Sequence, residues 1–206
     1  MTAEDSDATP ARAPRMPGPQ RRAALLSAAR DRFARHGFHG AATADIARGA
    51  GCSEAVLYRH FPSKRDLLVA VLKNEIETRL AAGRGFVPPP GADPVAGLPD
   101  ILAARLAEPE MVTTIRLVLL AIGMADDPEV GAAVRASFAT VRGSMVEAMR
   151  AGQAAGGLRA DLDPDLAAWL WHGLFMVAAV RNSAGDDDVA MGAVEAGRLL
   201  GRLLSP

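Results

Sequence analysis

Residues 43–64, TADIARGAGCSEAVLYRHFPSK, combine a glycine-bearing turn with apolar and polar residues at helical spacing. Two short helical segments, expected at 43–50 and 54–61, stand on either side of a turn at 51–53. Glycine is common just past the end of a helix, and serine is a preferred cap at the start of one. Two very short helices joined by a glycine turn predict a helix-turn-helix unit.

Longer helices are expected on both sides of this unit. Along residues 20–36, apolar side chains recur at i, i+4 and i+8 with arginines on the opposite face, and Gly37 provides a stop. Another helix is expected from residue 64 to about residue 82, before a proline- and glycine-rich loop at 83–94. Further helices, most with proline in the first turn, are expected at 94–107, 109–124, 128–154, 164–182 and 187–204. The predicted fold class is therefore all-α, with about nine helices.

The composition divides the chain into three parts. Residues 1–19 mix proline, alanine and charge without periodicity and are expected to be a disordered arm. Residues 11–66 hold 11 Lys and Arg against 4 Asp and Glu, a balance of +7, whereas residues 67–206 hold 12 against 17, a balance of −5. The early segment therefore favours an anionic partner. We expect a helix-turn-helix domain at 20–66 and a second helical domain at 67–206.

The composition also disfavours secreted and membrane proteins. A single cysteine allows no internal disulfide and suits a reducing cytoplasm. The first 20 residues lack the apolar core of a signal peptide. The longest apolar run, 166–180, has 15 residues including His172, whereas a membrane span needs roughly 20. We expect a cytoplasmic protein without a membrane helix.

The stretch 42–67, ATADIARGAGCSEAVLYRHFPSKRDL, resembles the DNA-binding module of TetR/AcrR-family transcriptional regulators. Its Ile-Ala, Ala-Gly-x-Ser, Leu-Tyr-x-His-Phe and Ser-Lys-x-x-Leu elements have the spacing of that family, and the resemblance extends over residues 20–68. Residues 151–164, AGQAAGGLRADLDP, resemble the loop before the eighth helix of such regulators. The resemblance implies a homodimer that binds a double-stranded DNA operator and responds to a small-molecule effector.

The second short helix carries most of the residues expected to contact DNA. A helix across the major groove presents small and polar residues of its first turn to base edges, and longer donors to phosphates. Residues 53–60 follow that order. The resemblance implies that Tyr58, His60 and Lys64 donate to phosphates, while Thr43 adds a hydroxyl from the preceding helix. The expected DNA-contacting residues are Thr43, Ser53, Glu54, Ala55, Val56, Tyr58, Arg59, His60 and Lys64.

Some positions depart from the family pattern. Glu54 stands where a cation is common, and it either accepts from a cytosine amine or favours the positive end of the helix dipole. Val56 cannot bond a phosphate, although its methyl groups can meet a thymine methyl. Ala41 and Ala42 replace hydroxyl residues, so capping of the first short helix is expected from Thr43 alone. We expect an operator unlike that of close relatives.

Cys52 occupies the turn and has two interpretations. It is a small buried thiol or a redox sensor, which requires an exposed thiolate of low pKa. His36 and His39 stand on either side of Gly37 with no Cys or carboxylate at ligand spacing, so no metal site is predicted. The sequence has no pairing of nucleophile and base and no glycine-rich phosphate loop. We therefore predict no catalytic residue, no enzyme activity and no cofactor.

The second domain has two apolar, methionine-bearing segments that can wall an effector pocket, 111–124 and 169–176. Their polar members are Arg116, His172 and two threonines, which suits a mostly apolar ligand. Core packing is the alternative for each of these residues, and His172 in particular can be a satisfied core histidine. The expected pocket residues are Met111, Ile115, Arg116, Leu119, Met124, Trp171, His172 and Phe175.

The last two helices are expected to form a dimer interface. Residues 166–180 are apolar nearly all round, which implies burial on several sides. In the last helix small residues recur at i, i+4 and i+8 and allow close approach of another helix. Two such helices and their copies make a four-helix arrangement. The expected interface residues are Leu166, Leu170, Gly173, Val177, Ala193, Gly197, Leu200 and Gly201.

The predicted function is a homodimeric, ligand-responsive repressor that leaves a palindromic operator when an effector binds. The alternative is an interaction adaptor that kept the fold and lost specific operator binding, for which Glu54, Val56 and the missing hydroxyls argue. The sequence encodes no direction of regulation, so an activator is also open. It identifies neither the effector, nor the operator, nor the regulated genes.

Overall fold

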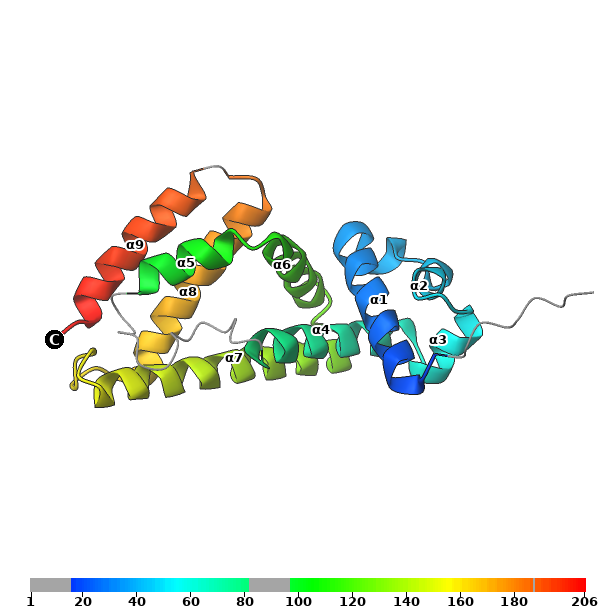
Figure 1. The fold of residues 1–206 in the computed structure, drawn as a ribbon, viewed down its shortest axis with the longest axis horizontal. Coiled ribbons are helices and arrows are strands. Elements are labelled where there is room, and N and C mark those ends of the chain that lie inside the picture. Colours follow the sequence, from blue (N-terminus) through cyan, green and yellow to red (C-terminus); the bar gives the residue numbers. More distant parts are fainter. Residues whose placement is uncertain (1–15, 82–96, 187) are drawn as a thin grey trace, which may run out of the picture.

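The computed structural model describes residues 16–81, 97–186 and 188–206, and the regular structure within these ranges is helical (Figure 1). The helices are α1 (Gly18–Gly40), α2 (Thr43–Gly49), α3 (Glu54–His60), α4 (Lys64–Ala81), α5 (Leu98–Leu106), α6 (Pro109–Ile122), α7 (Pro128–Ala154), α8 (Pro164–Ser183) and α9 (Val189–Leu204). The predicted all-α fold with about nine helices is confirmed for these ranges. Residues 1–15 of the predicted arm and the predicted loop at 83–94 lie outside them.

The helix boundaries lie close to those expected from the sequence. α1 begins at Gly18, inside the predicted arm, because Pro19 fits a first helical turn, where its missing N–H is not needed. The predicted stop at Gly37 coincides with a break in the helical backbone, where φ is +67°, before one further turn ends at Gly40. α7 has the predicted bounds in full.

One apolar core holds α1, α2, α3 and the first turns of α4 together, and we call this part the head. The largest of its fully buried side chains are Leu25, Phe33, Ile46, Leu57, Leu67 and Leu68. Leu117 of α6 is 1% exposed and belongs to the same cluster, with Leu120 packed against it. The head is therefore closed on one side by a helix from the second half of the chain.

A second core fills the remainder, which we call the body. Figure 1 shows α7 running alongside α4, with α5, α8 and α9 together at the end away from the head. Trp171 and Phe175 of α8 are 0% and 2% exposed at the centre of this core. α4 packs against α1 in the head and against α7 in the body, so it connects the two parts.

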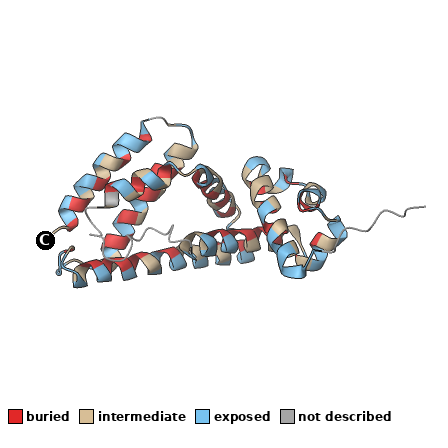
Figure 2. Cartoon of the chain, viewed as in Figure 1, coloured by how far each residue is buried: buried red, intermediate tan, exposed pale blue. Residues whose placement is uncertain are grey.

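Within one protomer, α8 is buried on one side only, and the dimer contact expected from the sequence stays a prediction. Leu166, Leu170, Gly173 and Val177 all lie on an exposed face, and Val177 is 61% exposed. Figure 2 shows buried and exposed segments alternating along α8. Only the opposite face of α8 enters the core, because α6, α7 and α9 pack against that face and leave the outer face uncovered. Among the described residues, the helices lack the combination of length and apolarity that a bilayer span requires.

The small-residue stripe of α9 lies inside the protomer instead of at the predicted interface. Ala193, Gly197 and Gly201 are buried, and a Cβ added at Gly197 would lie 3.5 Å from the Cα of Pro99 in α5. The stripe therefore permits close approach of α5. These small residues pack within the protomer and are not available to a second copy of the chain. Leu200 is partly buried against the body core.

Replacing Gly197 with leucine is expected to lower the free energy of unfolding by about 1–3 kcal/mol, because the side chain meets the α5 backbone. Gly192 on the same helix has open space where a Cβ would lie, so Gly192→Leu is the matched control. Urea denaturation of both variants measures the difference. Equal stability of the two variants would contradict the packing of α9 on α5.

Candidate nucleic-acid interface and effector cavity

The turn between α2 and α3 is fixed by backbone hydrogen bonds at the end of α2. The amide of Gly51 donates to the carbonyl of Arg48 at 3.0 Å, and the amide of Cys52 donates to that of Ala47 at 2.9 Å. This pair is the Schellman arrangement, which needs a left-handed residue after the helix cap. Gly51 supplies it with φ +66°. The sequence signal for the turn is therefore confirmed in its local geometry.

Arg21 of α1 ties this turn to the longer helix behind it. Its Nη1 donates to the carbonyl oxygens of Ala50 at 2.6 Å and Gly51 at 2.9 Å. Carbonyls at a helix end lack partners within their own helix, so a cation that donates to them satisfies the bonds and the helix dipole together. The turn is held rigidly in this way although α2 has only 7 residues.

α3 is fastened to the head on one side and free on the other. Leu57 is 0% exposed, and Phe61, just past the helix end, is 2% exposed. Among the predicted DNA-contacting residues, Ser53, Glu54, Ala55, Tyr58 and Arg59 are exposed, and Thr43, Val56, His60 and Lys64 are partly exposed. All nine residues are at least partly accessible, and hydrogen-bond distances bring Thr43 of α2 together with Glu54 and Tyr58 of α3.

Thr43 does not cap α2, contrary to the expectation from the sequence. The cap position belongs to Ala42, and Thr43 is the first helical residue. The Thr43 hydroxyl donates to a carboxylate oxygen of Glu54 and lies 3.3 Å from the Tyr58 hydroxyl. Glu54 is thus held by a neighbouring helix, an arrangement that neither interpretation of this residue from the sequence included.

Lys64 stands at the start of α4 beside the end of α1. Its Nζ lies 4.9 Å from the centre of the Phe38 ring and donates to the carbonyl of His39 at 3.4 Å. Partial burial lowers the pKa of Lys64 below its ordinary value. The aromatic face and the carbonyl aim the ammonium group without neutralising it.

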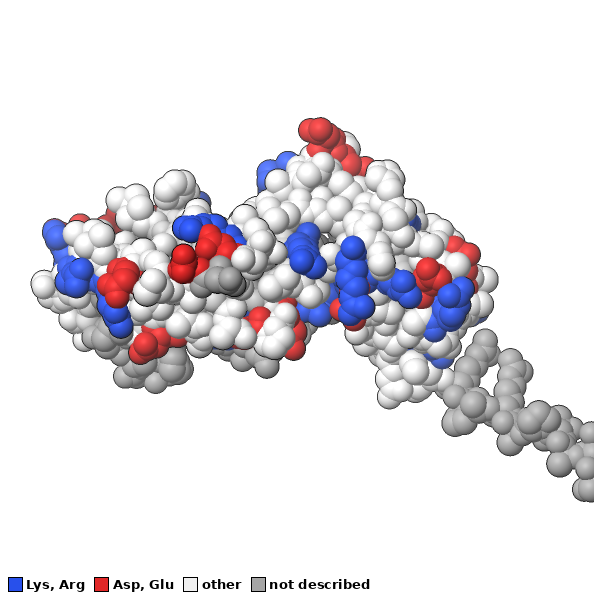
Figure 3. All heavy atoms as spheres, turned by 90° about the horizontal axis from the view of Figure 1, so that it is seen from above, with Lys and Arg blue, Asp and Glu red and all other residues white. Residues whose placement is uncertain are grey.

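Further basic side chains surround this surface, and Figure 3 shows Lys and Arg over the head on the face that it draws. Arg22 stacks on Phe61 with 5.0 Å between the guanidinium carbon and the ring centre. Arg48 is widely exposed but its Nη1 lies 2.7 Å from a carboxylate oxygen of Asp45. Arg22 was not predicted as part of this surface. The sequence pattern of α1 indicates an arginine-rich face but does not show which other helix lies next to that face.

Cys52 has a partly buried position beside the head core, packed among its apolar side chains. This placement agrees with the packing interpretation of the thiol.

An apolar cavity lies in the body between α4, α6, α7 and α8. It holds about 660 Å³ of space between atoms, part of which is open to solvent. Four of the predicted pocket residues, Met111, Ile115, His172 and Phe175, line it. Its polar side chains come from Arg79, Thr114, Ser137 and His172. Burial lowers the pKa of His172, which favours the neutral imidazole in this apolar setting.

The other four predicted pocket residues lie elsewhere. Arg116 and Leu119 are exposed, because they lie on the outer face of α6. Met124 comes after the last residue of α6 and packs against the head. Trp171 is fully buried in the body core without lining the cavity. The side chains that α4 and α7 contribute were missed, because helical periodicity gives a buried face but not a void within it.

Comparison with known proteins supports the interpretation of the head as a helix-turn-helix unit. A family model described as bacterial regulatory proteins of the tetR family matches residues 25–71, which include every predicted DNA-contacting residue. The HTH-type transcriptional activator FasR of Mycolicibacterium smegmatis is 41% identical over 70 residues, covering 34% of this chain and 32% of FasR. The chain thus matches about a third of the length of that relative.

Two comparisons extend beyond the head. The HTH-type transcriptional regulator UidR of Escherichia coli is 28% identical over 142 residues, covering 69% of this chain and 71% of UidR. The solved structure of Salmonella enterica GusR superposes with a TM-score of 0.72 and 26% identity, covering 91% of this chain and 98% of GusR. The arrangement of head and body is therefore shared along nearly the whole chain.

Gly51→Ala is expected to destabilise the protein by roughly 1–2 kcal/mol, because a side chain disfavours the left-handed backbone of the turn. Gly49→Ala is the control, since its added Cβ would lie 3.4 Å from the Cβ of Ala28 in ordinary contact. Alanine in a helix is favoured over glycine, so this control is expected to keep or raise stability, by up to about 1 kcal/mol. Thermal unfolding followed by circular dichroism compares the two, and a smaller loss for Gly51→Ala than for Gly49→Ala would count against the turn geometry.

Proposed function

The chain belongs to the TetR family of bacterial regulatory proteins, and we propose that it acts as a sequence-specific DNA-binding transcriptional regulator. The observation that carries this proposal is the placement of α3. This 7-residue helix is anchored through the buried Leu57, and its outer residues are exposed. The turn before it is held by hydrogen bonds from Arg21. Such a helix enters a major groove without rearrangement, and the phosphate contacts around it set its register.

A second copy of the chain is the partner that the exposed faces of α8 and α9 fit. Trp169 and Val177 on α8 and Met191 and Leu203 on α9 are each more than 60% exposed. Contiguous apolar surface of this kind marks an interaction site. Pairing through it gives a homodimer in which two copies of α3 read the halves of a palindromic operator.

The cavity of the body is the proposed site of a small, mostly apolar effector. Side chains of α4 line it, and α4 also packs against α1 in the head. An effector that binds better to the DNA-free arrangement releases the operator, and this is the action of a repressor.

An adaptor that no longer binds a specific operator is the second candidate. Thr43 favours it, because its hydroxyl already bonds to Glu54 instead of being free for a phosphate. Under this alternative the same surface of the head receives a protein instead of DNA.

Selection of bound fragments from the source genome, at about 150 mM salt to suppress non-specific phosphate binding, tests the proposal. Recovery of a palindromic site is the expected result. A folded, dimeric and ligand-free preparation that enriches no fragment would instead favour the adaptor.

Lys64→Ala is expected to weaken binding to all DNA sequences and to reduce the slope of log affinity against log salt by about 1, because one phosphate contact is lost. Lys73 on the same helix is exposed and has Glu77 3.8 Å away, so Lys73→Ala is a matched control that should leave the slope unchanged. Fluorescence anisotropy across a salt series measures both. An unaltered slope for Lys64→Ala would remove Lys64 from the phosphate contacts.

Glu54→Ala separates two roles of this carboxylate. Because Thr43 donates to Glu54 in the structure, its removal frees the hydroxyl and is expected to raise affinity for all sequences. If Glu54 also reads a cytosine, preference at one base pair of each half-site changes as well, by roughly 1–3 kcal/mol. Affinities for the operator and for single-base variants distinguish the two, and a loss of affinity without any change in preference contradicts both.

A further inference from the structure

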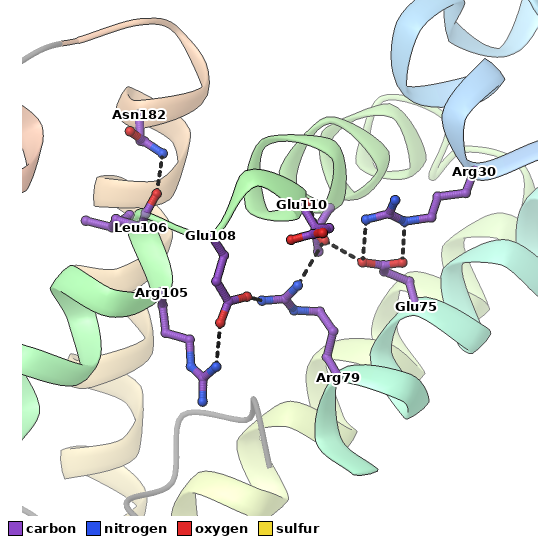
Figure 4. Close-up of polar contacts among 9 residues, drawn as sticks. Arg30, Glu75, Arg79, Arg105, Leu106, Glu108, Glu110 and Asn182 are labelled. Atoms are coloured by element: carbon purple, nitrogen blue, oxygen red, sulfur yellow. Dashed lines mark hydrogen bonds and ion pairs between the residues drawn. The ribbon is translucent and has the colours of Figure 1, made fainter. Parts of the chain in front are cut away.

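One buried carboxylate joins the head to the body. Glu75 of α4 is 7% exposed and Thr114 of α6 is 5% exposed, and these are the buried polar side chains among the described residues. Arg30 of α1 donates from Nε to one oxygen of Glu75 at 2.8 Å, and the Thr114 hydroxyl donates to the other. Figure 4 shows the Arg30 guanidinium facing this carboxylate. Three helices therefore meet at a single acidic group.

This junction adjoins the effector cavity directly. Thr114 lines the cavity, and so does Arg79, whose Nη1 lies 3.5 Å from the Thr114 hydroxyl. Arg79 is held from the other side by Glu108, with its Nη2 2.7 Å from a carboxylate oxygen (Figure 4). Arg30, Glu75 and Arg79 also line a separate polar cleft between α1 and α4. Thr114 is therefore the cavity residue that bonds to the carboxylate which holds α1.

The Thr114 hydroxyl has two acceptors within reach. Besides Glu75, the main-chain oxygen of Glu110 lies 3.1 Å from Oγ1. A hydroxyl has one proton and donates to one acceptor at a time. When the hydroxyl donates to Glu110, the Glu75 oxygen that it leaves, Oε1, has only the Nη2 of Arg30 as a donor, at 3.5 Å. A buried carboxylate oxygen without a good donor is unfavourable, so this choice of acceptor is coupled to the position of Glu75 and Arg30.

Building on the regulator function proposed above, we propose that Thr114 transmits occupancy of the cavity to the DNA-binding head. An occupant with a hydrogen-bond acceptor beside Thr114 draws its hydroxyl away from Glu75, and the Arg30–Glu75 contact loosens. α1, which holds the turn before α3 through Arg21, then shifts. Thr114 is a positioning residue in this scheme and touches no DNA. By linkage, DNA binding weakens the affinity of the cavity for its occupant by the same factor.

The test measures whether the effect of an occupied cavity on DNA affinity requires the Thr114 hydroxyl. Thr114→Val removes the hydroxyl and keeps the shape of the side chain. Thr113→Val is the matched control, since Thr113 is partly buried on the same helix and does not line the cavity. The probe is Nile red, an uncharged and mostly apolar dye whose carbonyl oxygen can accept a hydrogen bond. Each chain is titrated against a DNA fragment that the wild-type chain selects, with and without saturating dye.

Dye is expected to weaken DNA binding at least fivefold, about the lower limit of typical allosteric coupling, in the wild type and in Thr113→Val. In Thr114→Val the same dye is expected to change DNA affinity by less than about twofold, although the variant without dye binds DNA somewhat less tightly than the wild type. Such non-additivity is the signature of two changes that act through one contact. A purely structural role of Thr114 would lower stability in this variant and leave the dye effect intact.

Ser137→Gln provides a second occupant, because Ser137 lines the cavity and the longer side chain carries an amide oxygen that can accept from a hydroxyl. If the dye does not bind, the Ser137 substitution is introduced into the wild type, into Thr114→Val and into Thr113→Val. The proposal is overturned if an occupied cavity leaves wild-type DNA affinity unchanged, or weakens Thr114→Val as much as the wild type. A wild-type chain that binds no fragment better than random DNA overturns the regulator function itself, which is a distinct result.

Discussion

A helix of 7 residues has too few backbone bonds to hold its own position, and this limit shapes the whole head. α3 is fixed from behind by Leu57, from its N-terminal side by the left-handed turn at Gly51, and through that turn by Arg21 of α1. Each anchor lies on the inner side. The outer side makes few contacts within the head beyond those of Glu54 and Tyr58 with Thr43, so its residues remain accessible to a partner.

Local signals in the sequence were sufficient for the elements of the fold. Gly51, the prolines in first turns and the apolar spacing of α1 each act over a few residues, so they predicted the turn, the helix starts and the buried face. Contacts between distant helices were beyond such signals. The small residues of α9 correctly indicated close packing, but their partner is α5 in the same protomer, since periodicity describes one helix and not its neighbour.

The residues of the candidate sites were also predictable only where the signal is local in the sequence. The nine residues expected to contact DNA follow from a contiguous motif, and all of them are at least partly accessible on the head. The cavity depends on four helices, and the predicted pocket residues that line it, Met111, Ile115, His172 and Phe175, all come from α6 and α8. Glu75 had no signal at all, because it stands in the charged stretch Lys73–Arg79 that reads as surface. Its burial is tolerable because Arg30 and Thr114 satisfy both oxygens.

Leu117 of α6 lies in the apolar core of the head, although the chain reaches it only after α4 and α5. Genetic recombination between relatives at the boundary after α4 would therefore separate the head from part of its own core. A transplanted head would fold well only where the recipient offers a matching side chain at the positions of Leu117 and Leu120. The head and the α6 helix that completes its core are consequently inherited as a linked pair and are not freely exchangeable modules.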